Sequence, residues 1–599
     1  MDALIKVFIE WANQAKQWPL ILLAAIPPSF VFSKLYFDLS FSGAVNHWSF
    51  IASCGVICGV VGLLYYPIIC RAWPRLCVTG PLLILSILLI TTAFKPEPEP
   101  PPGAFVVAIT EFVPIPLDAK GEAATIREDI KDAMEARRNK GAAIYPRKIP
   151  ITIDDAIMED GKRKASNLGE SEKVKAKYVL WGKVKKGSGE LSPVLYLTAV
   201  SKWSKVPVND SALKDFIPPT LPVGGVSSMN NRERAKIIAD LVTFLCGLSD
   251  YDAGKWDEAI KNLDTLDTPS AYLYGGLCRY NLAQRQEDPA QYIDEAMELY
   301  KKVVLKWHSK KNEEQNKVVP ELDSQEDEEK VVVWAAYFNL ANAHLFLGRR
   351  REGHEAIDHL RAAVAAYEAA AGKYQDTATR LPWVLEINRG VALFELGRRT
   401  GAVDLQRAKD ELEVALSICD EELKLREDNP EQVKANRALT QIYIGAVMAE
   451  LAQRLKGGKK SEWLERAKAQ LEEGLRFYDI EAYPEQKRMA LINFANVQAD
   501  IGSEKPCDQG KVLLRNSIES YRKVLEECDR KKSPELYATT QYNLGCTLRD
   551  LSNCLQDGEK ETKLKEARDA YDAVIEVCGQ KMYPELMAMA KRDRAQAHR

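Results

Sequence analysis

Histidine is scarce in this sequence, and neither sign of charge dominates it. The 599 residues include six histidines, and 82 Lys and Arg stand against 85 Asp and Glu, for a formal net charge of −3. This balance excludes a globally basic nucleic-acid binder, and few histidines leave little general-base capacity. Residues 1–95 contain few charged residues of either sign, six basic and three acidic. A nearly uncharged head therefore precedes a highly charged body.

Two stretches of the head are long enough to cross a bilayer. Residues 48–70 and 76–94 contain no Asp, Glu, Lys or Arg, and a helical span needs about 20 mainly apolar residues. Residues 18–33 form a shorter candidate, which a Pro-Pro pair leaves open between a span and an interfacial segment. We therefore expect an integral membrane protein that contacts lipid through residues 18–94. The same residues offer a surface through which copies of the chain could oligomerise.

The side of the membrane that holds the body follows from loop charges. Arg71 and Arg75 lie between the two long stretches, and basic loops tend to be cytoplasmic, which favours an extracytoplasmic body. The twelve cysteines argue the other way, because they form no CxxC and no disulfide-scaffold spacing. Free thiols of that kind are typical of the cytosol.

A small α/β domain is expected after a proline-rich spacer at 96–103. Strand-like and helix-like stretches alternate after the spacer, at 104–112, 123–139, 142–151 and 153–168, and then as a hairpin at 176–184 and 194–203. This order predicts an α/β domain over 104–205, followed by a linker at 206–231. The phrases AITEF (108–112), IREDI (126–130) and AKYVLWGKV (176–184) resemble the TolB-like domain of bacterial signalling and envelope proteins. That resemblance implies an interaction domain in a bacterial inner-membrane protein.

The rest of the body is helical and repetitive. A Pro-Glu phrase recurs at Pro430, Pro484, Pro534 and Pro584, at spacings of 54, 50 and 50, and proline is favoured at the first position of a helix. Within the helices an Asn is followed two residues later by a small residue, as in Asn543-Leu-Gly545. Small residues at a fixed phase let a neighbouring helix approach closely.

The phrase ATTQYNLG at 538–545 resembles the tetratricopeptide repeat. This resemblance implies a right-handed superhelix of helix pairs, with about seven repeats over 232–583, a charged insert at 309–329 and a capping helix at 584–599. The expected fold is a membrane α-helical head, a small α/β domain and an all-α tetratricopeptide solenoid.

Recurring asparagines are the main candidates for binding. The resemblance places first-helix asparagines where family members hold the backbone of an extended peptide, and a side-chain amide offers both a donor and an acceptor. The alternative is that these amides fix the packing between helices. The candidates are Asn339, Asn342, Asn388, Asn493, Asn496 and Asn543.

A second candidate is a basic rim that follows the first helix in three successive repeats. Stacked repeats would align these residues into one positive edge for an anionic partner or lipid. The alternative is solvated turns, because basic residues complement the dipole at a helix C-terminus. The residues are Arg349, Arg350, Arg351, Arg398, Arg399, Lys459 and Lys460.

No catalytic, cofactor or metal site is expected. His354 and His359 are five residues apart, which places them on different faces of a helix, and Gly254-Lys255 lacks the P-loop spacing. Cys419, Cys528 and Cys578 share one repeat position and are expected to lie too far apart to pair. The sequence thus predicts a membrane-anchored scaffold that captures a protein or peptide, with no nucleic-acid partner. The alternative is a membrane effector or signalling protein, for example in stress or defence, in which partner sensing alters the transmembrane bundle.

Overall fold

The computed structural model describes residues 104–115, 120–139, 144–152, 165, 176–186, 191–199, 220–225, 231–286, 289–315, 325–374, 382–425, 430–478, 484–530, 533–578 and 583–597. The expected membrane spans and the proline-rich spacer lie outside these residues. Contacts divide the chain into two units, Met1–Leu195 with Val226–Asn230, and Tyr196–Gly225 with Asn231–Arg599.

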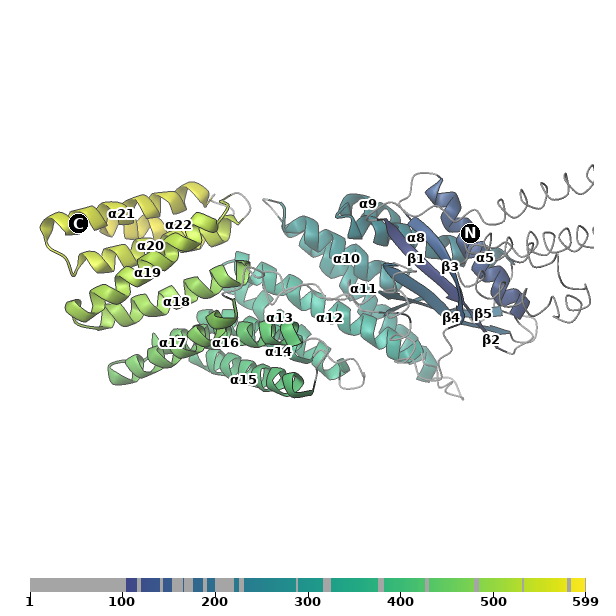
Figure 1. The fold of residues 1–599 in the computed structure, drawn as a ribbon, viewed down its shortest axis with the longest axis horizontal. Coiled ribbons are helices and arrows are strands. Elements are labelled where there is room, and N and C mark those ends of the chain that lie inside the picture. Colours follow the sequence, from purple (N-terminus) through teal and green to yellow (C-terminus); the bar gives the residue numbers. More distant parts are fainter. Residues whose placement is uncertain are drawn as a thin grey trace, which may run out of the picture. The chain divides into compact units, whose positions relative to one another are not determined.

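A mixed α/β arrangement forms the first part of the described chain (Figure 1). Its elements are β1 (Phe105–Glu111), β2 (Val113–Ile115), α5 (Lys120–Arg138), β3 (Ile144–Thr152), β4 (Tyr178–Lys186), β5 (Leu191–Ala199) and β6 (Thr220–Gly225). The strand order is β3-β1-β4-β5-β6, and β2 pairs with β4. The interior strand β1 pairs in parallel with β3 and β4, and its apolar residues are buried, as parallel strands require.

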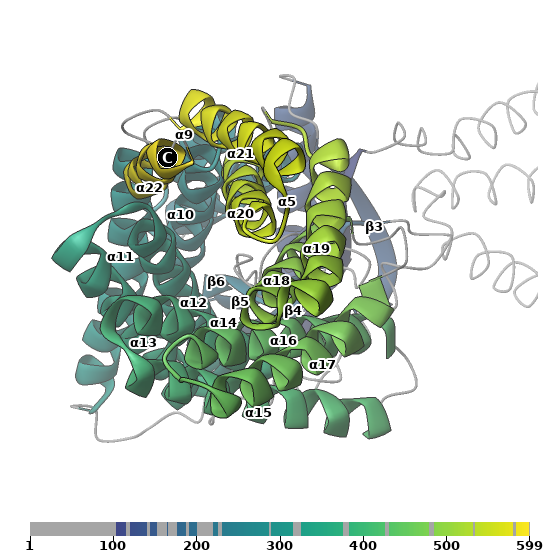
Figure 2. The same ribbon diagram turned by 90° about the vertical axis from the view of Figure 1, so that its left-hand side faces the viewer.

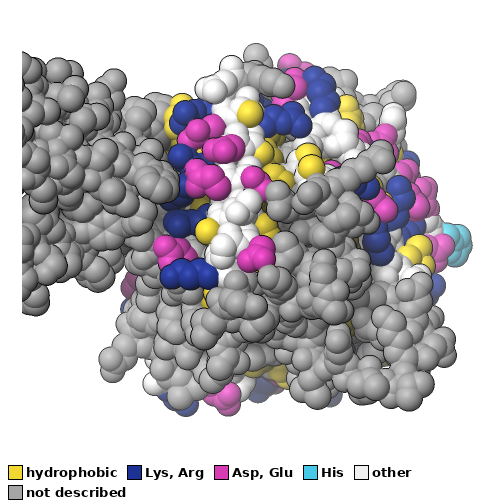
Figure 3. Space-filling view, turned by 90° about the vertical axis from the view of Figure 1, so that its right-hand side faces the viewer, with side chains coloured by type: hydrophobic (Ala, Val, Ile, Leu, Met, Phe, Trp, Pro, Cys, Tyr) yellow, Lys and Arg dark blue, Asp and Glu magenta, His cyan; other side chains and the backbone are white. Residues whose placement is uncertain are grey.

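The helix α5 connects the parallel strands β1 and β3. It buries Ala123, Ile126, Ile130 and Met134 along one face, which is the spacing that predicted this helix. Its exposed side is ion-paired, as at Lys131 and Glu135. In Figure 3, acidic and basic side chains intermingle over the coloured surface rather than gathering by sign.

Strand β6 falls in the stretch that the sequence predicted to be a linker, 206–231. Its sequence TLPVGG contains one proline and two glycines, which normally indicate a turn. Because β6 is the last strand in the order, its proline needs no partner on the outer side. A strand at the edge of the sheet can contain these turn-forming residues, which is why the sequence analysis predicted a linker instead of β6.

The second part of the chain is a series of antiparallel helix pairs, so the coarse prediction of a helical repeat solenoid is confirmed (Figure 1). The first helices of the pairs are α8 (Asn231–Asp252), α10 (Pro269–Ala283), α12 (Gln325–Arg350), α14 (Pro382–Thr400), α16 (Pro430–Ala452), α18 (Pro484–Glu504) and α20 (Pro534–Ser552). The second helices are α9 (Trp256–Leu263), α11 (Ala290–Gln315), α13 (Gly353–Tyr374), α15 (Ala402–Leu425), α17 (Gly458–Tyr478), α19 (Cys507–Glu527) and α21 (Asp557–Val577). The last helix is α22 (Pro584–Gln596).

Helix starts and helix approach follow the sequence pattern. Four helices begin at Pro430, Pro484, Pro534 and Pro584, as predicted. The small residues at fixed phase are also explained: a Cβ on Gly545 would lie 2.7 Å from the Tyr571 ring. Real Cβ atoms essentially never come that close, so α20 needs glycine where α21 crosses it.

The charged insert is shorter than the predicted 309–329. Helix α11 continues to Gln315 and α12 already begins at Gln325. Both ends of the insert are rich in Glu, Lys and Gln, which are strong helix formers. Their charge led the sequence analysis to include them in the insert, although they are helical. Within the described residues, one stretch of α12, Lys330–Arg350, is long and apolar enough to cross a membrane by composition, and 89% of it is buried inside the fold.

Candidate functional site

The first helices form the inner face of the solenoid. Consecutive first helices from α10 to α22 contact one another, whereas each second helix contacts the first helices before and after it. Figure 2 shows the first helices turned toward the inside of the curve and the second helices outside. The asparagines predicted to bind peptide lie on these first helices.

Between α12 and α14, two asparagines join neighbouring helix pairs. Asn342 Oδ1 accepts a hydrogen bond from the Tyr367 hydroxyl at 2.5 Å and another from Asn388 Nδ2 at 3.4 Å. Asn342 and Asn388 are 0% exposed, and Asn339 is 1% exposed. Here the amides are sealed inside the solenoid, out of reach of an extended peptide.

The same arrangement recurs nearer the C-terminus. Asn496 Oδ1 accepts from the Tyr521 hydroxyl at 2.5 Å and from Asn543 Nδ2 at 2.9 Å. In α16 the equivalent place is taken by Tyr443, whose hydroxyl lies 3.8 Å from Met489 Sδ. The amide contacts are therefore made at two separate junctions between helix pairs, α12 with α14 and α18 with α20.

These hydrogen bonds favour the packing alternative for Asn342, Asn388, Asn496 and Asn543. The C-terminal members differ in exposure, because Asn496 and Asn543 are half-buried rather than sealed. Asn493 is also half-buried, and its amide has no hydrogen-bond partner among the described residues. Peptide contact stays a prediction, and Asn493 is the amide best placed to make it.

A column of acids runs along the inner face, and the sequence analysis missed it. We call Glu395, Glu450, Asp500 and Asp550 the acid column. Each lies five residues after the small residue of its helix, at Gly390, Gly445, Ala495 and Gly545. The signal was present in the sequence as a fixed offset, but scattered acids on charged helices do not stand out.

Each member of the acid column contacts a side chain from the preceding first helix or, for Gln453, from the turn directly after it, eight residues after that helix's own small residue. The four contacts are Arg349 Nε to Glu395 Oε1 at 3.0 Å, Arg398 Nε to Glu450 Oε2 at 3.9 Å, Gln453 Nε2 to Asp500 Oδ2 at 2.6 Å, and Ser503 Oγ to Asp550 Oδ2 at 3.2 Å. The partner thus changes from guanidinium to neutral donors toward the C-terminus.

This change sets the electrostatics of the acid column. Burial alone would raise the pKa of Glu395, but Arg349, Arg398 and Arg399 outweigh it and lower that pKa. At Asp500, burial raises the pKa to about 6 against the opposing effects of Gln453 and Lys460. The C-terminal half of the inner face therefore has acids without a guanidinium from the preceding helix, beside half-exposed amides.

Most residues of the predicted basic rim are ion-paired in the structure. Arg398 and Arg399 both lie 3.6 Å from Glu395. The remaining contacts are Arg351 with Glu355 at 3.3 Å, Lys460 with Glu504 at 2.5 Å, and Arg350 over the Phe346 ring at 3.9 Å. Lys459 is exposed. These contacts favour solvated and paired turns over a positive edge.

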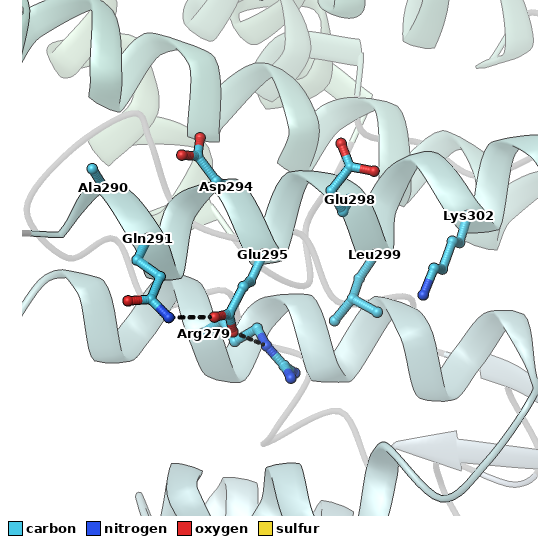
Figure 4. A pocket seen from close by; sticks show the side chains of 8 residues that line it. All are labelled: Arg279, Ala290, Gln291, Asp294, Glu295, Glu298, Leu299 and Lys302. Carbon is cyan, nitrogen blue, oxygen red and sulfur yellow. Dashed lines mark hydrogen bonds and ion pairs between the residues drawn. The ribbon is translucent and has the colours of Figure 1, made fainter.

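A hollow of about 790 Å³ lies beside α10 and α11 (Figure 4). Its one residue from α10, Arg279, bonds Glu295 at 2.9 Å and Asp264 at 2.8 Å. In Figure 4, the carboxylates of Asp294 and Glu298 point away from Arg279. The charged groups thus pair with each other or face outward, and they do not converge on a ligand.

His359 does not pair with His354. Its Nδ1 lies 3.0 Å from His344 Nδ1 on α12, so the pair links α12 to α13. Among the described residues, no group of three or more His, Cys, Asp or Glu is arranged to hold a metal ion.

The cysteines require a correction. Cys419, Cys528 and Cys578 are unbridged, as predicted, but the free thiols inferred from the lack of disulfide-scaffold spacing do not include Cys507 and Cys554, which are bonded with Cα atoms 5.3 Å apart. The repeat pattern did not reveal this pair, because Cys507 and Cys554 occupy different positions in their repeats. Cys419 and Cys578 are buried thiols, and burial raises the pKa of Cys419 to about 12.

Comparison with known proteins adds little. No family model matches this chain, and no curated protein matches its sequence. Two structures of Nro1, a nuclear import adaptor of S. pombe, align with 54% and 57% of this chain and 99% of their own, at 10% and 11% identity and TM-scores of 0.28 and 0.27. A circular tandem repeat protein aligns over 62% of this chain and 82% of its own at 13% identity, with a TM-score of 0.19. At such TM-scores, none of these likenesses decides the architecture or function of this chain.

Proposed function

We propose that this protein is a membrane-anchored scaffold whose tetratricopeptide-type solenoid captures a protein or peptide partner. The observation that supports the proposal best is the contrast along the inner face. Asn342 and Asn388 are sealed and hydrogen-bonded, whereas Asn493 is half-exposed and has no partner among the described residues. A binding surface needs polar groups that still have hydrogen bonds to make.

The proposed binding surface is the inner face of α18 and α20. Asn493 offers an amide donor and acceptor there, and Asp500, whose contact from the preceding helix pair is the neutral Gln453, contributes negative charge. Asp550 is paired with Arg549 of its own helix at 3.3 Å. An extended segment could satisfy Asn493 and Asp500 through its peptide units. The proposal assigns no reaction and no cofactor to the chain.

Site-specific photo-crosslinking tests this proposal. A photoreactive residue replaces Asn493 on the inner face or, as the control, Val512 on the outer helix α19, which is 58% exposed. We expect a discrete crosslinked partner from position 493 and none from position 512. Equal crosslinking from both positions, or none from position 493, would contradict capture by the inner face.

The proposal also includes the membrane anchor and the side of the membrane on which the body lies. Residues 48–70 and 76–94 would hold the chain in a bacterial inner membrane, with the body extracytoplasmic. The Cys507–Cys554 bond supports that side, because disulfides persist in oxidising compartments. Protease should then cut the body in cells with an opened outer envelope, and Arg71→Glu with Arg75→Glu should disturb that orientation. A body that resists protease until the inner membrane is opened would exclude this topology.

A further inference from the structure

The Cys507–Cys554 bond joins two neighbouring helix pairs at one edge. Cys507 is the first residue of α19, and Cys554 lies in the turn between α20 and α21. Both belong to the turns that connect a first helix to its second helix, and we call the row of these turns the turn edge. The bond spans 47 residues, close to one repeat.

The preceding junction uses charged side chains at the same edge. Between α16–α17 and α18–α19, Lys460 pairs with Glu504 at 2.5 Å and Lys505 with Glu465 at 3.4 Å. Between α18–α19 and α20–α21, the polar contact at this edge among the described residues is Ser503 with Asp550 at 3.2 Å. The disulfide therefore takes the place of ion pairs at this junction.

The bond is open to attack from solvent. Cys507 is exposed and Cys554 is half-buried, and exposed disulfides tend to be the labile and regulatory ones. Cys546, a nearby thiol on α20, is half-buried against the Tyr571 hydroxyl at 3.5 Å. Burial raises the pKa of the Cys546 thiol, so it makes a poor internal nucleophile. An external dithiol is thus the reagent to which this bond is suited.

We propose that Cys507–Cys554 is a reversible modification site at which a dithiol reductant releases the last helices, α20 to α22, from the rest of the solenoid. One thiolate of the dithiol attacks the exposed Cys507 sulfur, and the Cys554 sulfur leaves and takes up a proton. The second thiol of the reductant then displaces the Cys507 sulfur, which is protonated in turn. The protein disulfide gains two electrons and two protons, and the dithiol becomes a disulfide.

Reduction would loosen this junction without dissolving it. Away from the turn edge, Asn543 still bonds Asn496 at 2.9 Å, Arg522 pairs with Glu566 at 2.8 Å, and the two pairs share buried apolar residues. The lost constraint is closure of a 47-residue loop, which restricts the opened ensemble strongly. The opening equilibrium of α20 to α22 is the quantity that should change.

Hydrogen exchange of the purified full-length protein, with and without dithiothreitol, tests the proposal. We expect α20 to α22 to exchange at least about tenfold faster after reduction, while α12 to α15 stay unchanged. The variant Cys507→Ser with Cys554→Ser should exchange fast in both conditions. The matched control Cys546→Ser should keep the response to reductant.

Three results would overturn the proposal. The first is equal exchange of α20 to α22 in oxidised and reduced wild type. The second is a response to dithiothreitol that survives in the double variant. The third is complete alkylation of Cys507 and Cys554 in protein purified without reductant, which would show that the bond does not form. None of these readouts needs a binding partner, so they are independent of the crosslinking test at position 493.

Discussion

Arg349 Nε on α12 donates to Glu395 Oε1 on α14 at 3.0 Å, across the junction between two helix pairs. Glu395 is 8% exposed, and Arg398 and Arg399 lie within 3.6 Å of its other carboxylate oxygen. Three guanidinium groups from two helices thus share one buried carboxylate. This cluster fixes the first contact of the acid column.

Removing that carboxylate should destabilise the solenoid. Glu395→Ala leaves Arg349 and its neighbours without their acid in a half-buried site, and we expect a loss of about 3 kcal/mol, as for breaking a buried ion pair. Glu355→Ala breaks the exposed pair with Arg351 and should cost under about 0.5 kcal/mol. Denaturant unfolding of both variants measures the difference. Similar midpoints would contradict a structural role for Glu395.

The asparagines should separate into two groups. Asn342→Ala removes the acceptor that binds the Tyr367 hydroxyl inside the solenoid and should cost about 1–3 kcal/mol of stability. Asn493→Ala removes a half-exposed amide that has no hydrogen-bond partner in the described part of the chain, and it should change stability by under about 0.5 kcal/mol while weakening capture of the binding partner. Thermal melts beside partner recovery distinguish the two. If Asn493→Ala melts as low as Asn342→Ala, position 493 is a packing position as well.

Stability should depend on pH through His344. Burial, reinforced by His359, lowers the pKa of His344 from 6.5 to about 4. Between these pH values the unfolded chain binds a proton at His344 that the folded chain does not bind. The free energy of unfolding therefore decreases as pH falls from 6.5 toward 4. The loss approaches about 1.4 kcal/mol per pH unit.

The difference between wild type and His344→Gln isolates this contribution. Asp500, whose pKa burial raises to about 6, acts in the opposite direction, but it is present in both proteins and cancels. The wild-type advantage in unfolding free energy should therefore shrink as pH drops. The exposed His354→Gln serves as a control that should follow the wild-type curve. Parallel curves for wild type and His344→Gln would refute a buried neutral histidine.

Two glycines should respond oppositely to alanine. At Gly545 an added Cβ would lie 2.7 Å from the Tyr571 ring, so Gly545→Ala should cost about 1–3 kcal/mol through overpacking. At Gly558 in α21 nothing lies within 4 Å, so Gly558→Ala should add about 0.4–1 kcal/mol. Thermal unfolding of both variants measures these changes in stability. An unchanged melting temperature for Gly545→Ala would mean that α20 and α21 can move apart without loss of stability.

The helical repeats could be predicted because their signals are local. Proline at 430, 484, 534 and 584 fixes where helices start, and a small residue at fixed phase fixes where they cross. Both depend on backbone sterics, which a single sequence displays directly. The same reasoning failed at β6, where proline and glycine in an edge strand look like a turn.

The candidate site was less predictable because it depends on contacts between repeats. Asn388 and Asn493 hold the same repeat position, two residues before the small residue, yet among the described residues only Asn388 bonds an amide of the preceding pair, Asn342, which also holds the Tyr367 hydroxyl. Whether an amide is sealed or open is set by residues about 25 and 46 positions away. The Cys507–Cys554 pair was missed for the same reason, since its partners hold different repeat positions.

The offsets that build the acid column also bear on how the chain could change length. A donor eight residues after the small residue meets an acid five residues after the next one, at every junction from α12 to α20. Excising or duplicating one whole helix pair would bring another donor and another acid face to face in the same register. Three of these four junctions are therefore interchangeable in register, whereas the fourth, between α18–α19 and α20–α21, also depends on the Cys507–Cys554 bond. Gain or loss of repeats would be tolerated before α18 and resisted after it.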